Sequence, residues 1–241
     1  MTEDKTTENM LMELIAEECT IDTSEVIDFP PSALSFGHST LQTKGGEIKY
    51  PISLGSYGNL SVITAPPKSK KSFYCSLLAS VYLSGANNFG GKLRGHRDGR
   101  CLIHIDTEQG HWHASRSFKR IEYKTFALRT VGYKERLEFM EYVLEQNKGK
   151  NGLVILDGVA DIVSDVNDLV SCNAAVSKLM QLSTKYDCHI LCVIHQNFGS
   201  SKMTGHLGSF LEKKAELVTS LELNTTNKDL VTVKCMRSRG Y

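Results

Sequence analysis

The sequence contains no long hydrophobic run, no signal-peptide pattern and almost no net charge. None of its apolar stretches approaches the ~18 consecutive residues that a transmembrane helix needs. The N-terminal segment MTEDKTTENM is polar and acidic, unlike a signal peptide. With 28 Lys and Arg against 27 Asp and Glu, the net charge is +1, so any nucleic-acid binding would depend on a local basic patch. We therefore expect a cytoplasmic protein that does not bind membranes.

A CxxC pair is also missing. The seven cysteines are odd in number and mostly lie in apolar runs such as ILCV and RCLI, so we expect buried, reduced thiols rather than disulfides or zinc ligands. His104, His111 and His113 match no strong zinc spacing. With 241 residues, of which 41% are hydrophobic, the chain is long enough for one large domain or for a domain with a short N-terminal arm.

Residues 1–50 differ from the rest of the chain. Met10–Glu18 has the apolar spacing of a short amphipathic helix. The stretch 28–51 contains proline, serine and glycine, which is typical of an extended linker. We therefore predict an N-terminal arm and linker over residues 1–50 and a globular domain over residues 51–241.

From Gly58 onward, short apolar segments alternate with segments of helical periodicity. Strands are predicted at Asn59–Thr64, Arg100–Asp106, Gly152–Leu156, His189–His195, Leu217–Leu223 and Leu230–Cys235. Helices are predicted at Lys71–Leu83, from about His113, at Tyr133–Gln146 and at Asp168–Tyr186. This alternation indicates an α/β fold with a mostly parallel twisted sheet flanked by helices. The last two strands, joined by a short turn, should form a hairpin at one edge.

A candidate phosphate-binding loop follows the first of these strands and opens a helix. It comprises Ala65, Pro66, Pro67, Lys68, Ser69, Lys70, Lys71, Ser72 and Phe73. Such a loop wraps backbone N–H groups around phosphates, with Lys71 reaching the β- and γ-phosphates of ATP and Ser72 binding Mg²⁺. Ala65 and Lys70 stand where the usual pattern has glycine. Taken alone, the stretch would more often be a solvated basic turn.

Three further polar positions follow buried strands. Asp157 ends the run LVILD, as in a Walker B motif, whose carboxylate holds Mg²⁺ through water. Glu108 could activate the attacking water, and Gln196 could sense the γ-phosphate. For Asp157 the alternative is a strand that simply ends at an Asp-Gly turn, and for Glu108 it is a surface acid. For His195, which precedes Gln196, the alternative is a packed, hydrogen-bonded histidine. All nevertheless fall at carboxyl ends of strands, where open parallel sheets bind ligands.

The order of these motifs resembles the RecA/DnaB superfamily of ATPases, and more closely the small RecA-like (AAA_25 or RepA-like) ATPases of bacterial mobilizable elements. The matching segments are GNLSVITAPPKSKKSF, HIDTEQGHWHASR, LVILDGVADIV and HQNFGSSKMTGHLGSFLEKKAE, which span residues 58–216. In that narrower group a basic residue before the phosphate-loop lysine is familiar, which accommodates Lys70. The resemblance implies a RecA-like core in which the strand before Gln196 lies between those of Ala65 and Asp157.

The resemblance also implies catalytic roles for Lys71, Glu108 and Gln196, and assembly into a homo-oligomeric ring or filament with ATP between subunits. In relatives a basic residue from the neighbouring subunit reaches the γ-phosphate, and Arg237 and Arg239, together with Lys234, are the matching candidates. A solvated basic tail is the alternative for these three.

The loop Phe198–His206 stands where RecA-like proteins place a DNA-binding loop. Glycine, serine and Lys202 suit phosphate contacts, although the three aspartates of Asp161–Asp168 would repel DNA, and a plain flexible loop is the alternative. The leading prediction is a Mg²⁺-dependent ATPase, as a helicase, translocase or DNA-remodelling factor in replication or mobilisation of a mobile element, with single-stranded DNA as candidate partner. The alternative is a regulatory or scaffold module whose degenerate phosphate loop supports little or no hydrolysis.

Overall fold

The computed structural model describes residues 3–22, 24, 30–85, 89–118 and 123–239. The chain divides into two units, Met1–Pro30 and Pro31–Tyr241. The first unit contains α1 (Glu3–Cys19), which begins earlier than the predicted Met10–Glu18. Its apolar side chains are exposed, with Met10, Leu11 and Leu14 each more than half accessible. In the part of the chain that the structure describes, no helix has the length and apolar character to cross a membrane.

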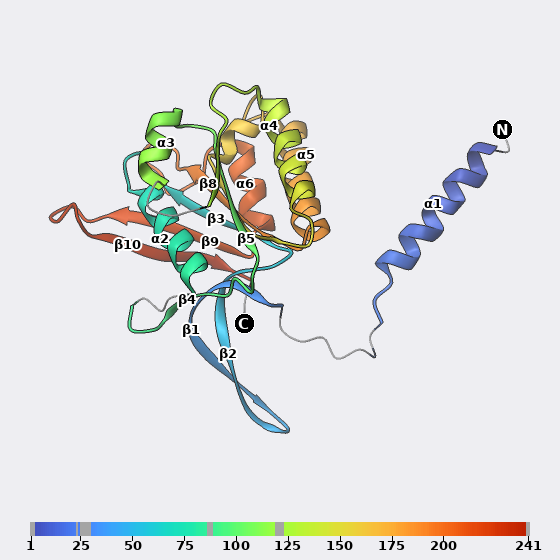
Figure 1. The fold of residues 1–241 in the computed structure, drawn as a ribbon, viewed down its shortest axis with the longest axis horizontal. Helices are drawn as coiled ribbons and strands as arrows, with labels where there is room; N and C mark the ends of the chain where they lie inside the picture. Colours follow the sequence, from blue (N-terminus) through green and yellow to red (C-terminus); the bar gives the residue numbers. More distant parts are fainter. Residues whose placement is uncertain (1–2, 23, 25–29, 86–88, 119–122, 240–241) are drawn as a thin grey trace. The chain divides into compact units, whose positions relative to one another are not determined.

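The second unit is built on a seven-stranded sheet with the order β10-β9-β3-β8-β7-β5-β6 (Figure 1). The strands are β3 (Leu60–Ala65), β5 (Cys101–Asp106), β6 (Lys124–Ala127), β7 (Asn151–Asp157), β8 (His189–His195), β9 (Leu217–Leu223) and β10 (Val231–Ser238). All neighbours are parallel except β9 and β10, which form the predicted antiparallel hairpin at one edge. The predicted α/β class is confirmed, and β8 lies between β3 and β7 as the resemblance implied.

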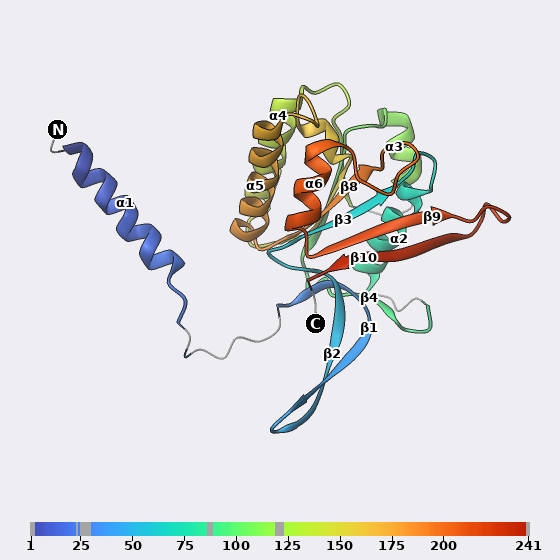
Figure 2. The same cartoon turned by 180° about the vertical axis from the view of Figure 1, so that it is seen from behind.

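Helices cover both faces of this sheet. On one face lie α4 (Tyr133–Gln146), α5 (Leu169–Lys185) and α6 (Gly205–Lys214), whose apolar residues pack on those of β3, β7 and β8 (Figure 2). On the other face α2 (Lys71–Ser84) packs on Ile63, Ile155 and Val193. The short α3 (His111–Phe118) follows β5, and the 3-10 helix η1 (Val159–Ile162) follows β7. Strands buried on both faces explain the continuous apolar runs of β7 and β8.

The stretch expected to be linker forms strands instead. β1 (Ser32–Thr43) and β2 (Gly46–Ser56) make an antiparallel hairpin, and β4 (Leu93–Gly95) joins β1 in a small second sheet. The tight turn uses Gly46 with φ 120°, a conformation that favours glycine. Ala33 and Leu34 of β1 pack with apolar residues of α2, so the small sheet shares the core of the second unit. The linker prediction over 28–51 is therefore wrong from residue 32 onward, and residues 28 and 29 lie outside the described residues.

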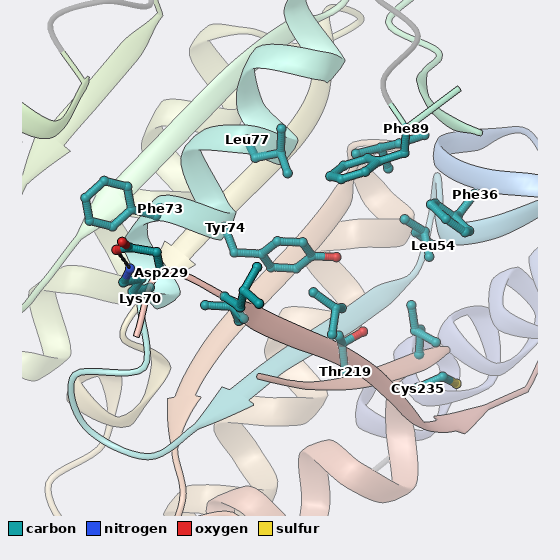
Figure 3. Close-up of a pocket in the computed structure, with 15 residues that line it drawn as sticks. Phe36, Leu54, Lys70, Phe73, Tyr74, Leu77, Phe89, Thr219, Asp229 and Cys235 are labelled. Carbon is teal, nitrogen blue, oxygen red and sulfur yellow. Dashed lines mark hydrogen bonds and ion pairs between the residues drawn. The ribbon is translucent and has the colours of Figure 1, made fainter. Parts of the chain in front are cut away.

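An apolar groove of about 710 Å³ lies between α2, the β9–β10 hairpin and the small sheet. We define it by Phe36, Leu54, Phe73, Phe89, Leu230 and Val233. The ion pair of Lys70 with Asp229 stands at one end of it and the Phe36 side chain at the other (Figure 3). Phe73, Phe89 and Leu230 are each more than half exposed, so the groove presents apolar surface to its surroundings.

Candidate functional site

The phosphate loop connects β3 to α2, as its sequence context predicted. The two positions that depart from the glycine pattern differ in backbone conformation. Lys70 has φ 62° and ψ 31°, in the left-handed region that favours glycine, whereas Ala65 does not have a positive φ. Ala65 is buried and its carbonyl accepts a hydrogen bond from Gln196 N–H at 3.1 Å. Alanine is therefore compatible with the first position, while lysine at the second carries a conformational cost.

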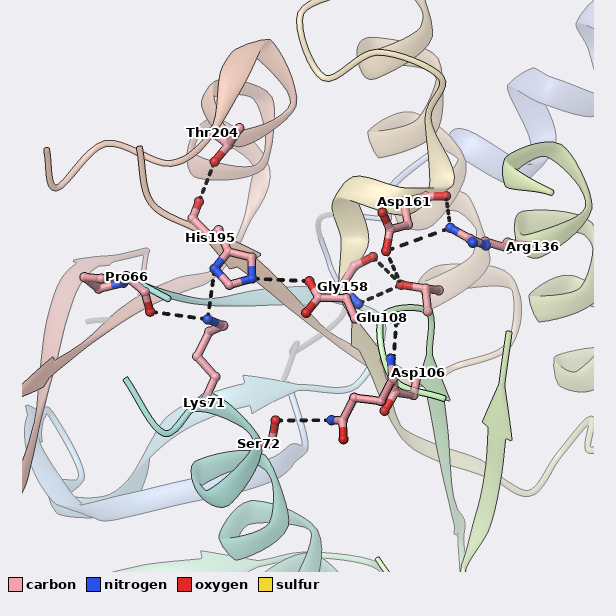
Figure 4. Close-up of polar contacts among 12 residues, drawn as sticks. Pro66, Lys71, Ser72, Asp106, Glu108, Arg136, Gly158, Asp161, His195 and Thr204 are labelled. Carbon is pink, nitrogen blue, oxygen red and sulfur yellow. Dashed lines mark hydrogen bonds and ion pairs between the residues drawn. The ribbon is translucent and has the colours of Figure 1, made fainter. Parts of the chain in front are cut away.

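Lys71 opens α2 and directs its side chain toward the carboxyl end of β8. Its Nζ donates to the Pro66 carbonyl at 3.4 Å and lies 3.1 Å from His195 Nδ1 (Figure 4). The residue is only 8% exposed. Burial lowers the pKa of Lys71, and the negative charges of Glu108 and Asp157 act against that shift. The ammonium thus stands in a partly desolvated place opposite two carboxylates.

Glu108 is positioned by the turn that follows β5. Asp106 Oδ1 accepts hydrogen bonds from the backbone N–H groups of Glu108 at 3.1 Å and Gln109 at 2.8 Å, which fixes this turn. The Glu108 carboxylate meets His195 Nε2 at 3.3 Å. That hydrogen bond is the main reason why the pKa of Glu108 is lowered, and burial opposes it.

Hydrogen bonds join the carboxyl ends of β5 and β7. Thr107 N–H donates to the Asp157 carbonyl at 2.7 Å, and Thr107 Oγ1 accepts from Gly158 N–H at 2.9 Å. A Cβ atom on Gly158 would lie 2.6 Å from Glu108 Oε1, so a side chain there would displace the carboxylate. Glycine after Asp157 therefore permits the close approach of Glu108.

Asp106 of β5 and Asp157 of β7 place two buried carboxyl groups at this edge of the sheet. Asp157 is 4% exposed, and burial, with the negative charges of Asp106 and Glu108, raises its pKa to about 7. Burial also raises the pKa of Asp106. Among the described residues, Asp106 Oδ2 is buried without a hydrogen-bond partner. Such a concentration of buried oxygens favours a bound cation.

Mg²⁺ fits the donors at this edge. Ser72 Oγ lies at the start of α2, 3.5 Å from Gln109 Nε2, and faces the side of the sheet edge where Asp106 lies (Figure 4). Within the described ranges no group of three or more His, Cys, Asp and Glu forms a ready metal cage. Mg²⁺ is usually held by one or two protein oxygens together with water and substrate phosphates, so a hydroxyl with neighbouring carboxylates suits it.

The structure brings most of the predicted site residues to one edge. Lys71, Ser72, Glu108 and Asp157 lie there, and Gln196 continues β8 beside Ala65 through its backbone. Of the remaining loop residues, Ser69 is buried, Lys70 is half-buried, and Pro66, Pro67, Lys68 and Phe73 are exposed.

Arg237 and Arg239 are not part of this edge. Lys234 and Arg237 both lie within β10, which extends three residues beyond the predicted end of this strand at Cys235. Arg237 Nε contacts Glu212 of α6 at 2.7 Å, and Arg239 donates to the Lys213 carbonyl. Because α6 and α2 cover opposite faces of the sheet, the Arg237 contact lies on the face away from the phosphate-loop helix.

Sequence reasoning missed three residues that organise the site. Asp106, Thr107 and Gln109 supply the turn, the clamp between β5 and β7, and the contact with Ser72. The polar run DTEQ directly after a buried strand was the available signal. His195 had been weighed as a packed, hydrogen-bonded histidine, and its partly exposed ring makes polar contacts with both Lys71 and Glu108.

Comparison with known proteins supports the fold. A family model described as an AAA domain, AAA_25, matches residues 54–200. In the comparison with curated proteins, no protein matches this chain. Among solved structures, the flagellar accessory protein FlaH from Methanocaldococcus jannaschii is similar, with 14% identity, a TM-score of 0.52, and coverage of 76% of this chain and 79% of that chain. At that identity the likeness shows the fold alone.

Proposed function

This chain belongs to the AAA_25 family of AAA domains, and from that premise we propose that it binds and hydrolyses ATP with Mg²⁺ at the carboxyl edge of its sheet. One observation carries the proposal. The buried ammonium of Lys71, at the end of the phosphate loop, stands opposite the carboxylates of Glu108 and Asp157. These groups come from segments far apart in sequence, so their convergence supports a shared chemical task.

The proposed chemistry assigns one role to each group. The loop N–H groups and Lys71 bind the phosphate oxygens, with Lys71 exchanging its contacts to Pro66 and His195 for the nucleotide. Ser72 and Asp157 would hold Mg²⁺, which would supply positive charge to neutralise the phosphates. Glu108 orients the attacking water and accepts its proton, and the Gln196 amide contacts the γ-phosphate.

We further propose that the active form is a ring or filament of identical chains. Arg237 is 64% exposed on the outer strand of the sheet, which suits a residue that completes a neighbour's site. Arg239 directly follows that strand. The first unit, Met1–Pro30, acts as an arm in this proposal, because the exposed apolar side chains of α1 need a partner surface to bury them.

Single-stranded DNA is the proposed polymer on which this ATPase acts, as a helicase, translocase or remodelling factor in replication or mobilisation of a mobile element. The loop after β8 supports this. Phe198 is fully exposed there, and the exposed Lys202 lies four residues further on. An exposed aromatic ring can stack on a base while a lysine contacts phosphate, a combination that tolerates any sequence.

An ATP turnover assay with and without single-stranded DNA tests the proposal. Lys71→Ala should abolish Mg·ATP binding and turnover while the fold is retained, because the phosphates lose their buried cation. Lys150→Ala is the matched control, since Lys150 is exposed in the turn before β7, at the opposite end of the sheet. Unchanged nucleotide affinity in Lys71→Ala would refute the phosphate-loop assignment. A parent protein without turnover would favour the scaffold alternative.

Fluorescence anisotropy with labelled single-stranded DNA, in the presence of an ATP analogue, tests the polymer. We expect modest affinity that falls steeply with salt, because bound phosphates release counterions. Lys202→Glu and Phe198→Ala should weaken binding and leave DNA-independent hydrolysis intact. Equal binding by the parent and both variants would exclude this loop, and absence of binding by all three would point to a protein partner.

A further inference from the structure

His195 connects two groups of the proposed site through one ring. It is the last residue of β8, and its side chain is 36% exposed. Its Nδ1 lies 3.1 Å from Lys71 Nζ, and its Nε2 lies 3.3 Å from Glu108 Oε1 (Figure 4). The backbone beneath the ring is held firmly, because Thr204 donates to the His195 carbonyl from both its N–H (3.1 Å) and its hydroxyl (2.9 Å).

The two partners determine which ring nitrogen carries the proton. A lysine ammonium can only donate, so Nδ1 must present its lone pair to Lys71. An ionised carboxylate can only accept, so Nε2 must carry a hydrogen toward Glu108. Both contacts are therefore satisfied by a single form, the neutral imidazole protonated at Nε2. The doubly protonated ring would lose the contact with Lys71, and the other neutral tautomer would lose both.

We propose that His195 is a positioning residue of the ATPase, whose neutral Nε2–H imidazole holds Lys71 and Glu108 together in the nucleotide-free protein and releases Lys71 to the phosphates of an incoming nucleotide. This inference rests on the proposed function. Lys71 has only two polar contacts among the described residues, His195 and the Pro66 carbonyl, so phosphate oxygens must compete with Nδ1 for the ammonium. After that exchange, His195 still donates to Glu108 and keeps the carboxylate oriented.

Two opposite effects follow from removing the ring. Without Nδ1 the buried Lys71 ammonium loses an acceptor in the nucleotide-free state, so nucleotide should bind more tightly. Without the Nε2–H donor Glu108 loses its orientation, so turnover should slow. A residue with a purely structural role would weaken both steps together, whereas His195 should lower KM and kcat at the same time.

The tautomer can be measured without any hydrolysis. Nitrogen-15 NMR of the nucleotide-free protein at neutral pH should show His195 protonated at Nε2 and unprotonated at Nδ1. Lys71→Met should shift the Nδ1 resonance, and Glu108→Gln should shift that of Nε2. A ring protonated at Nδ1, or resonances insensitive to both substitutions, would overturn the inference. Because this readout needs no ATP, it separates failure of the inference from failure of the proposed function.

Steady-state kinetics provide the second test. In His195→Leu we expect kcat to fall by roughly 10- to 100-fold, the scale of a misplaced catalytic group, while KM for ATP falls several-fold. His195→Gln should recover much of both, because its amide oxygen can accept from Lys71 and its amide nitrogen can donate to Glu108. His38→Leu, at an exposed histidine of β1, is the matched control and should behave like the parent. A rise in KM, or no change in kcat, in His195→Leu would contradict the role.

Discussion

The carboxyl edge of the sheet and the outer strand β10 are built in opposite ways. At the edge, Lys71, Asp106 and Asp157 are no more than 8% exposed, and hydrogen bonds between strand ends fix their neighbours. On β10 every residue from Thr232 to Ser238 is exposed, and its charged side chains make surface ion pairs. The first region is organised within one chain. The second presents exposed charged side chains to the surroundings of the protein, which fits the proposed role of Arg237.

The strongest test of this comparison mixes two variants, one defective in the arginines of the outer edge and one defective in the phosphate loop. Arg237→Ala combined with Arg239→Ala should reduce turnover of the assembled protein by roughly 10³-fold, the scale of a lost arginine finger. Nucleotide binding should persist, because the phosphate loop is untouched. Mixing this variant with Lys71→Ala should restore part of the activity, since a mixed interface joins one intact loop to intact arginines. No restoration in the mixture, with both variants assembled, would place the arginines outside a neighbour's site.

At the carboxyl edge, Glu108→Gln should slow hydrolysis by roughly 10²-fold or more, the scale of a lost general base. ATP should remain bound, because Lys71 and Ser72 are unchanged. Single-turnover measurements separate this loss from a binding defect. Glu138→Gln, at an exposed glutamate of α4, serves as control. Turnover at the parent rate in Glu108→Gln would remove this carboxylate from the chemistry.

The buried carboxylates should make stability depend on pH. Asp157 has a pKa of about 7 in the folded protein against an ordinary value of 3.8, so the native state retains a proton that the unfolded state has lost between these values. The free energy of unfolding of the nucleotide-free protein should therefore fall as pH rises from about 4 to about 7, by on the order of a few kcal/mol. Asp157→Asn should flatten this slope in thermal unfolding. An equally steep slope in that variant would contradict the assignment.

The smallest expected effect concerns the two departures from the glycine pattern. Lys70→Gly removes a lysine whose backbone has the left-handed conformation, which should stabilise the fold. It also removes the mostly exposed ion pair with Asp229, so we expect the free energy of unfolding to stay within ~0.5 kcal/mol of the parent. Ala65→Gly should destabilise by roughly 0.5–1 kcal/mol, because its backbone gains nothing from glycine. Denaturant unfolding compares the two. A larger loss in Lys70→Gly than in Ala65→Gly would reverse the order.

Local patterns predicted well the elements with clear periodicity or continuous burial, and predicted poorly the elements that are short or largely exposed. The bounds of α4, β8 and β9 agree with the prediction, because each is a run of clear periodicity or continuous burial. β4 and β6 were missed because three or four residues carry too little pattern. α6 was missed because its two glycines and its serine resembled a loop, although Leu207 and Leu211 bury one side of it. β1 and β2 were missed for a similar reason, since most of their side chains are exposed.

By itself, the sequence determined the α/β class and the identity of Lys71, Ser72, Glu108 and Asp157 as site candidates, whereas the place of β8 between β3 and β7 was predicted from the family resemblance. Apolar runs that end in polar residues are local features, so the chain displays them before it folds. Only the tertiary structure decided that His195 bridges Lys71 and Glu108, and that burial, together with the charge of Asp106, raises the pKa of Asp157. These interactions join residues from different elements of the fold, and the distances between them arise only when the parallel sheet aligns its carboxyl ends.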